Sequence, residues 1–473
     1  MSFQQGLSGL NASSKNLDVI GNNVANASTV GFKGSQAQFS DVYAASLSGA
    51  TGTQVGLGVQ VATVAQLFTQ GNITVSNNPL DVAINGRGFY RMATDAGAVS
   101  YTRNGQFQLD KDGFIVDSGG RRLTGYDVKT APDPLNPSQN IDSPDTGVDI
   151  NLQISPNAQS DALATGASGA GKGAEVQLNL DSRLTVPTVN VTSTVASPVP
   201  SPSSYNSATS VQIYDSLGNS HSQTMYFVQN PTVPAGGGAI WDVWVAVDGT
   251  TVGNVSINGT AQDTTVVAPA TKPTPRLQLQ FDTSGKLTNY LVGGVSVPLS
   301  SPPSVTVNLN NVLAQQNPSQ INKAASPQTY TLNMQNSTQF GAEFAVSSVI
   351  QDGHASGKLA GFNVSSDGAV LARYTNGQSK TLGFIHLVAF ANPQGLIPVG
   401  NNQWVESSAA GSRIDGTPGV GIFGVVQSGA VEDSNVDLTK ELVDMITAQR
   451  VYQANAQTIK TQDQVLNTLV NLR

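Results

Sequence analysis

The sequence has no cysteine among its 473 residues, which excludes disulfide bonds and cysteine-based metal sites. Charged residues make up only 11% of the chain, and aromatic residues only 6%. The formal net charge is −8 and lysine and arginine form no cluster, which disfavours binding to nucleic acid or to an anionic membrane. Because the sequence has no apolar run of about 18 residues, we expect no membrane-spanning helix.

Sequence motifs of catalysis and of cofactor binding are also missing. The three histidines lie far apart and show no metal-ligand spacing. Residues 419–424 match the glycine pattern of dinucleotide-binding loops, but no helical pattern follows them, so a turn at a strand end is the simpler interpretation. Residues 166–172 approach a phosphate-binding loop, but Gly173 stands where a serine or threonine is needed. We therefore expect no enzyme, no cofactor and no bound metal.

The middle of the chain is rich in short strand and turn signals. The sequence has 48 glycines and 23 prolines, and threonine, valine, serine and asparagine dominate its central part. Residues 211–214 and 224–228 have strand character and flank Asp215-Ser-Leu-Gly-Asn219, which predicts a β-hairpin. Four prolines between residues 130 and 145 predict a linker there.

Both ends of the chain carry an apolar residue at a repeat of about 3.5 residues, a pattern typical of helices that pack side by side. These residues are Phe3, Leu7, Leu10, Leu17 and Val24 at the N-terminus, and Leu438, Leu442, Met445, Tyr452, Ile459, Leu466 and Val470 at the C-terminus. One such helix at each end predicts that the two ends come together as a coiled-coil stalk. The alternative is a pair of amphipathic helices, each docked on its own domain.

Together these patterns predict a multidomain chain. We expect a helical coiled-coil stalk formed by the N- and C-terminal helices, with two or more all-β outer domains nested in the middle of the chain. The expected parts are a helical domain from 1–24 and 434–473, an extended connector at 25–70, an inner β domain from 71–145 and 345–433, and an outer region at 146–344 with one or two β subdomains. Because the N-terminal helix contains three glycines, each costing about 1 kcal/mol, we expect it to fold only when neighbours surround it.

Two terminal segments resemble the flagellar rod and hook protein family. Residues 22–33, Asn-Asn-Val-Ala-Asn-Ala-Ser-Thr-Val-Gly-Phe-Lys, are similar to its N-terminal motif, and residues 445–455, Met-Ile-Thr-Ala-Gln-Arg-Val-Tyr-Gln-Ala-Asn, are similar to its C-terminal helix. Residues 101–105 and 400–404 add shorter matches. The motif positions are Asn22, Asn23, Asn26, Gly31, Phe32, Lys33, Gln449, Arg450 and Asn455.

Within this family, the large central region resembles that of hook proteins. The resemblance implies a subunit that polymerises into a curved, hollow tube, which acts as a universal joint and transmits motor torque to the filament. It implies four kinds of partner: other copies of the chain, the distal rod, the hook cap and the hook–filament junction proteins.

The resemblance also implies an extracellular location in the flagellum, reached through the flagellar type III export apparatus. Residues 1–6 have neither the basic nor the apolar segment of a cleaved signal peptide, which agrees with such a route. Two alternatives remain: a distal rod or hook–filament junction protein of the same family and, from another class, a secreted β-rich adhesin.

Overall fold

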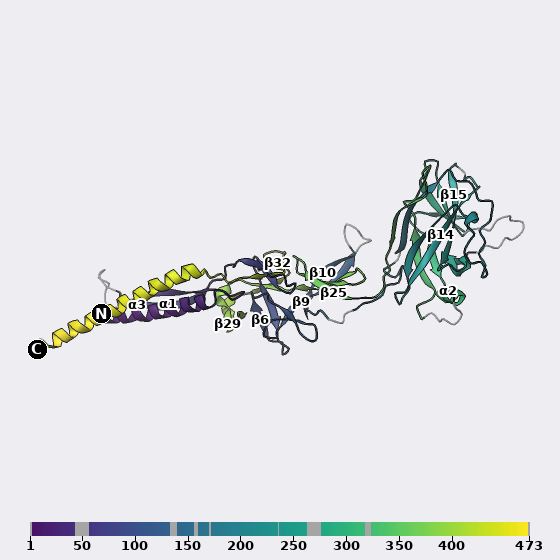
Figure 1. Cartoon of the computed structure of the whole chain (residues 1–473). Coiled ribbons are helices and arrows are strands. Elements are labelled where there is room, and N and C mark those ends of the chain that lie inside the picture. Colours follow the sequence, from purple (N-terminus) through teal and green to yellow (C-terminus); the bar gives the residue numbers. More distant parts are fainter. Residues whose placement is uncertain are drawn as a thin grey trace. The chain divides into compact units, whose positions relative to one another are not determined.

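The computed structural model divides the chain into two compact units (Figure 1). Unit 1 comprises Met1–Ala158, Leu359–Arg373 and Ser379–Arg473, and unit 2 comprises Gln159–Lys358 and Tyr374–Gln378. The structure describes residues 2–42, 56–132, 140–155, 159–169, 172–234, 236–262, 276–316 and 323–471. The chain is therefore multidomain and mostly β, with a helical part at its termini, as the sequence predicts.

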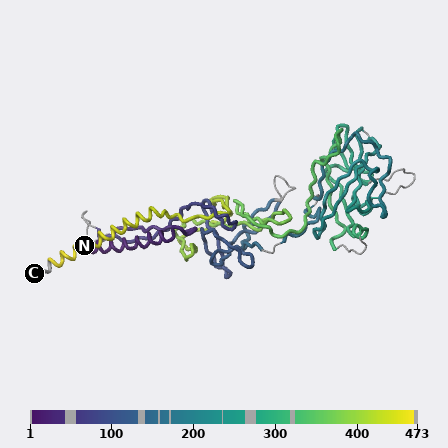
Figure 2. The backbone as a smooth tube through the Cα atoms, viewed as in Figure 1, coloured from purple at the N-terminus to yellow at the C-terminus, as the bar shows by residue number. Residues whose placement is uncertain are grey.

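Two long helices at the chain ends belong to unit 1. They are α1 (Ser2–Ala25) and α3 (Leu438–Asn471), and they lie side by side, purple beside yellow in Figure 2. The second helix begins at Leu438, within the segment 434–473 that the sequence predicts to be helical. The Oδ1 atom of Asp437 accepts hydrogen bonds from the backbone N–H groups of Thr439 (2.9 Å) and Lys440 (3.2 Å), which satisfies donors that the first helical turn leaves unpaired.

Residues 25–70, expected as an extended connector, contain a β-hairpin. Strand β1 (Ser35–Val42) pairs antiparallel with β2 (Gly58–Gln66), and the pairing register shifts once, between Gln38 and Phe39. Both strands of the hairpin lie against α1. Just before β2, the carbonyl of Gly56 accepts a hydrogen bond from the side chain of Gln5 at 2.6 Å.

A larger antiparallel sheet forms the body of unit 1. Its strands in spatial order are β25 (Gly357–Val364), β26 (Ala369–Tyr374), β27 (Ser379–Ile385), β9 (Arg122–Pro132), β5 (Phe89–Ala93), β6 (Val99–Thr102), β30 (Gln403–Val405) and β29 (Ile397–Gly400). Five further strands join it: β7 (Gln108–Leu109), β8 (Ile115–Val116), β10 (Asn140–Asn151), β28 (Leu387–Phe390) and β31 (Arg413–Gly416). Two separate pairs are β3 (Ile73–Val75) with β33 (Ala430–Glu432) and β4 (Val82–Asn85) with β32 (Val425–Ser428).

Unit 2 is a sandwich of two sheets, with β14 and β15 labelled in Figure 1. One sheet has the order β17 (Thr260–Ala261), β16 (Val255–Ile257), β21 (Ser304–Val307), β22 (Gln328–Asn333), β12 (Gly173–Asp181) and β23 (Thr338–Phe340), with β24 (Ala345–Gln351) also paired to β12. The other has the order β13 (Ser207–Tyr214), β14 (Ser220–Asn230), β15 (Ala239–Val247), β18 (Leu277–Phe281), β19 (Leu287–Val292) and β20 (Val295–Pro298). Two small elements complete the unit: helix α2 (Leu309–Gln316) and strand β11 (Gln159–Ser160).

Alternation of apolar and polar residues explains why these strands pack as two layers. Every second residue of β12 faces the same core as every second residue of β15, so Val176 and Leu178 meet a cluster that also holds Trp241 and Val243. The predicted hairpin at residues 215–219 is confirmed, since β13 and β14 pair around it. The Oδ1 atom of Asp215 accepts from the backbone N–H groups of the turn, at 2.8 and 2.9 Å.

The proline-rich linker expected at residues 130–145 is wrong for the part of this segment that the structure describes; residues 133–139 lie outside it. Strands β9 and β10 pair antiparallel through much of this segment, with Pro144 opposite Val128. Among the described residues, β10 pairs only with β9, so it is an edge strand, where a proline is tolerated. The strand pairing also places the borders between the β domains elsewhere than at the expected residues 146 and 345. Residue 146 lies inside β10 of unit 1, and β24, which begins at residue 345, pairs with β12 of unit 2.

Candidate functional site

Helices α1 and α3 contact each other through small residues. A Cβ atom placed on Gly6 would lie 3.1 Å from the side chain of Ile459, and one on Gly9 would lie 2.9 Å from the side-chain amide of Asn455. Ala12 on α1 and Ala448 on α3 are buried in the same region. The close approach uses residues with little or no side chain, and a larger residue at Gly6 or Gly9 would require the facing side chain of α3 to shift.

Most of the predicted apolar stripe lies away from the glycine side of α1, and Ile459, beside Gly6, is the exception. Five of its residues are half-buried: Leu10, Leu17, Val24, Met445 and Ile459. Six others are between 36% and 54% exposed: Phe3, Leu7, Leu438, Leu442, Tyr452 and Leu466. The side chain of Val470 lies outside the described residues. The physical reason is that the glycine side of α1 permits a closer approach than its leucine side.

A groove of about 860 Å³ runs between α1, the β1–β2 hairpin and α3. Apolar side chains from all three elements line it, including Ala12, Ile20, Phe39, Leu67, Ala448 and Val451. Phe39 and Leu67 are about two-fifths exposed there, at 42% and 41%. The helical pair therefore presents to its surroundings a groove lined by both polar and apolar side chains, together with exposed apolar side chains along the helices.

The N-terminal motif joins α1 to the β part of unit 1. Asn23 is buried, and its side-chain amide donates to the carbonyl of Ser35 (2.8 Å) and to Glu441 (3.1 Å), while its Oδ1 accepts from the N–H of Ser35 (2.9 Å). Asn26 and Asn22 bond to each other where the helix ends. One asparagine thus ties α1 to both β1 and α3.

Gly31 and Phe32 continue the same junction. Gly31 has a φ of +70°, and a Cβ atom at this position would lie 2.6 Å from the backbone nitrogen of Asn104. Its N–H donates to the carbonyl of Glu432 at 2.8 Å. Both the backbone conformation and the lack of space therefore require glycine here. Phe32 is buried beside it.

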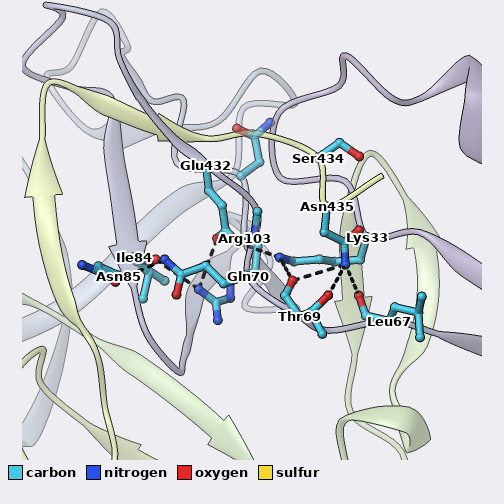
Figure 3. Close-up of polar contacts among 12 residues, drawn as sticks. Lys33, Leu67, Thr69, Gln70, Ile84, Asn85, Arg103, Glu432, Ser434 and Asn435 are labelled. Atoms are coloured by element: carbon cyan, nitrogen blue, oxygen red, sulfur yellow. Dashed lines mark hydrogen bonds and ion pairs between the residues drawn. The ribbon is translucent and has the colours of Figure 1, made fainter. Parts of the chain in front are cut away.

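Lys33, Arg103 and Glu432 form a buried ionic junction at the centre of unit 1 (Figure 3). The Nζ atom of Lys33 lies 2.6 Å from Glu432 Oε1 and donates to the carbonyl of Thr69 at 2.8 Å. The Nη1 atom of Arg103 lies 3.2 Å from Glu432 Oε2. The side chains of Lys33 and Glu432 have no exposed surface. Burial lowers the pKa of Lys33 and of Arg103, and the Glu432 carboxylate opposes that shift in both.

Asn435 closes the junction on the C-terminal side. Its Oδ1 atom accepts from the N–H of Gly34 (2.8 Å), and its Nδ2 atom donates to the carbonyls of Leu67 (2.7 Å) and Thr69 (3.2 Å) (Figure 3). Four stretches of chain therefore meet here: the residues after α1, residues 67–69 after β2, Arg103 after β6, and the residues before α3. The arrangement is structural, because every charged group in it is engaged with the protein itself.

The residues of the C-terminal motif behave differently from those of the N-terminal one. Gln449 and Arg450 are exposed on α3, and Asn455 is half-buried beside Gly9. Sequence reasoning missed Glu432 and Asn435. One signal was available for Glu432, since a carboxylate that ends the apolar strand Ala430-Val431-Glu432 needs a partner. Across the described residues, no group of three or more histidine, aspartate or glutamate side chains is arranged to hold a metal ion, and no helix is long and apolar enough to span a membrane.

Models of flagellar protein families match four segments of the chain. Residues 3–33 match the model described as flagella basal body rod protein, and residues 427–472 match flagellar basal body rod FlgEFG protein C-terminal. Residues 83–166 match the flagellar hook protein FlgE/F/G D1 domain. Residues 179–354 match the flagellar basal body protein FlaE D2 domain. The first two segments contain both helices and the motif residues of the junction.

Whole-length relatives share the same name. The chain is 39% identical over 475 residues to the flagellar hook protein FlgE of Escherichia coli K12 and 40% identical to that of Salmonella typhimurium LT2, with 100% of both chains covered in each case. It is 30% identical to FlgE of Borreliella burgdorferi, covering 100% of this chain and 99% of the relative. The crystal structure of Helicobacter pylori hook protein FlgE2 aligns with a TM-score of 0.46 at 14% identity, covering 75% of this chain and 99% of that one. Identity of about 40% over the full length shows that the chain belongs to the flagellar hook protein family.

Proposed function

We propose that this chain is the repeating subunit of a helical homopolymer, the curved and hollow hook that acts as a universal joint between flagellar motor and filament. The family is one of structural flagellar proteins. The observation that supports this mode of assembly is the apolar stripe on α1 and α3, whose described residues the subunit's own chain leaves half-buried or exposed.

Exposed leucine, valine and isoleucine side chains along a helix favour contact with further helices. Fully burying one such side chain contributes roughly 1.5–3 kcal/mol. The exposed set extends along α3 from Leu438 to Leu466, so the possible contact surface spans most of the helix. Contacts between different faces of neighbouring copies do not close on themselves and produce an open helical polymer.

We assign a role to each part of the chain on this basis. Residues 1–24 and 434–473 would make the polymer core, and the hairpin within residues 25–70 would extend that contact. The unit 1 sheet would form an inner β domain that the ionic junction holds against the helices. Unit 2, residues 159–358 with 374–378, would form the outer domain. The assembly residues proposed from the sequence remain the exposed and half-buried members of the stripe.

Other flagellar components complete the proposal. Copies of the chain would add onto the distal rod beneath a hook cap, and hook–filament junction proteins would bind the finished end. The type III export apparatus would deliver each subunit without a cleaved signal peptide. The low content of charged residues and the lack of cysteine agree with a chain that travels unfolded and folds outside the cell.

The substitution Leu442→Asp tests the assembly surface. Leu442 is 44% exposed on α3, so the variant should fold normally but place a charge where a neighbouring copy packs. The matched control is Leu217→Asp, at a leucine 54% exposed in a turn of unit 2. Electron microscopy of the assembled protein, with circular dichroism to verify folding, is the measurement.

We expect curved hollow tubes from the wild-type and Leu217→Asp chains and only monomers from Leu442→Asp. Normal tubes from Leu442→Asp would reject the helical stripe as the assembly surface. Straight tubes from the wild-type chain would favour a rod protein. A chain trimmed to roughly residues 71–430 should lack polymers altogether, because it lacks both helices.

A further inference from the structure

Strand β24 presents an open, uncharged edge in unit 2. Among the described residues it pairs only with β12, so no second strand is hydrogen-bonded to its other edge. Three of its apolar side chains are exposed: Val346 at 37%, Val349 at 40% and Ile350 at 60%. No charged residue occurs between Glu343 and Asp352.

Soluble proteins usually protect such an edge with lysine, proline or a covering segment. Residues 345–351, Ala-Val-Ser-Ser-Val-Ile-Gln, contain no lysine and no proline. A segment of this length that combines β-branched residues with no charge pairs readily with another strand. This edge therefore has the character of a docking site for an added strand.

A second uncharged edge lies on the other side of the same unit. Strand β20 ends the six-stranded sheet and pairs only with β19 among the described residues. Val295 in β20 is 67% exposed, and the sequence has no charge between Lys286 and Lys323. Strand β24 lies beside β13, which is the opposite end of that sheet. Five strand spacings separate β13 from β20, a distance of about 24 Å.

We propose that the β24 edge of one subunit docks against the β20 edge of a second copy. This inference rests on the proposed function, because it takes a homopolymer as its setting. The two edges differ and face opposite sides of the unit, so the contact runs head to tail and continues from copy to copy without closing. A contact of β24 with another β24 would instead be symmetric and would stop at two copies.

The size of the β20 edge limits the strength of this contact. β20 has only four residues, and its last, Pro298, has no backbone N–H to donate. The contact therefore has few backbone hydrogen bonds, and burial of its apolar side chains provides the rest of the binding free energy. A short contact of this kind can break and re-form as neighbouring subunits change their spacing.

Cysteine cross-linking tests the contact directly, because the chain contains no other cysteine. Ser347 and Ser296 are exposed, one in each strand. Full-length chains carrying Ser347→Cys, Ser296→Cys or both are assembled, checked by electron microscopy, and treated with a short bismaleimide. We expect a ladder of covalent oligomers from the double variant and none beyond the dimer from either single variant.

Two results would overturn the proposal. Well-formed tubes of the double variant that yield no ladder would show that the two edges do not meet. Efficient dimers from Ser347→Cys alone would show a symmetric contact instead. If the wild-type chain forms no tubes at all, the proposed function fails, and that failure is distinct from an absent ladder in tubes that do form.

A charge substitution provides a second readout. Val349→Lys puts a lysine on the edge, and the matched control is Val233→Lys, at a valine 69% exposed in a loop of unit 2. We expect about a tenfold higher subunit concentration for polymerisation with Val349→Lys, equivalent to ~1.4 kcal/mol per contact. Equal concentrations for the two variants would contradict the proposal.

Discussion

Glu432 is the residue on which the junction of unit 1 depends. Its carboxylate accepts hydrogen bonds from Lys33, Arg103 and the N–H of Gly71, so one side chain balances two buried cations. Replacing a buried ion pair by apolar residues is often neutral, whereas removing one partner is costly because the other charge stays buried. Glu432 is therefore a sensitive position, even though it makes no contact with solvent.

We predict that Glu432→Gln lowers the free energy of unfolding of unit 1 by about 3–5 kcal/mol. The matched control is Asp433→Asn, because the adjacent carboxylate accepts only an exposed hydrogen bond from Thr74 and should cost less than about 1 kcal/mol. Urea denaturation followed by hydrogen exchange in peptides of unit 1 measures both. Equal losses of unfolding free energy in the two variants would show that the buried ionic junction contributes no more to stability than an exposed carboxylate does.

His221 should make the stability of unit 2 depend on pH. Its Nδ1 atom lies 2.6 Å from Asp248 and its Nε2 atom 3.5 Å from Asp215, and the hydrogen bond that the ring donates to the Asp248 carboxylate raises the pKa of His221 above its usual 6.5. Because the folded state holds the proton more tightly, this stabilisation is complete below pH 6.5 and is lost as the pH rises through the folded-state pKa. Burial lowers the pKa of His386 in unit 1, so its effect has the opposite sign.

Urea denaturation at about pH 6 and about pH 9 tests this prediction, with the fluorescence of Trp241 and Trp244 reporting on unit 2. The wild-type unit should be less stable at the higher pH. The substitution His221→Gln should remove most of that difference. A pH dependence that survives in His221→Gln would assign it to other groups.

At the scale of elements, the glycines of α1 determine how closely it approaches α3. Gly9 faces Asn455, whereas an added Cβ atom at Gly21 would meet nothing within 4 Å. Both substitutions to leucine remove a glycine from a helix, which by itself should raise helix stability by about 0.8–1 kcal/mol. The two positions therefore form a matched pair in which only the contact with α3 differs.

Gly9→Leu should weaken polymerisation and Gly21→Leu should leave it unchanged or strengthen it. Leucine at position 9 would displace the Asn455 side chain and move α1 away from α3, which changes the surface that the helical pair offers to neighbours. Sedimentation of polymer over a range of subunit concentrations provides the comparison. The same loss for both variants would mean that close approach of the helices is not required.

At the scale of the whole molecule, local patterns were more informative than long-range ones. The heptads at both ends predicted two terminal helices, because apolar periodicity is a local property. The hairpin at residues 215–219 was predictable from its turn residues for the same reason. The side of α1 that contacts α3 was not predictable, because the helix has both a glycine side and a leucine side. Which side faces α3 depends on how the two helices pack.

Contacts between distant residues account for what the sequence did not reveal. Strand β10 contains a proline and several aspartates, so its composition indicates a linker, and only its partner β9 makes it a strand. Lys33 stood out as part of a motif, but its partner Glu432 lies 399 residues further along the chain. No spacing rule connects two residues that far apart, so the most buried ionic contact of unit 1 was not predictable.

That separation also determines the order in which the molecule can fold. Unit 2 lies entirely between Lys33 and Glu432, so its strands can pair before the last part of the chain is present. Unit 1 cannot complete its core until Glu432 arrives, when more than nine-tenths of the chain has already emerged from any narrow passage that admits the N-terminus first. The contact that joins the end of α1 to the residues before α3 can therefore form only when nearly the whole chain is available for folding.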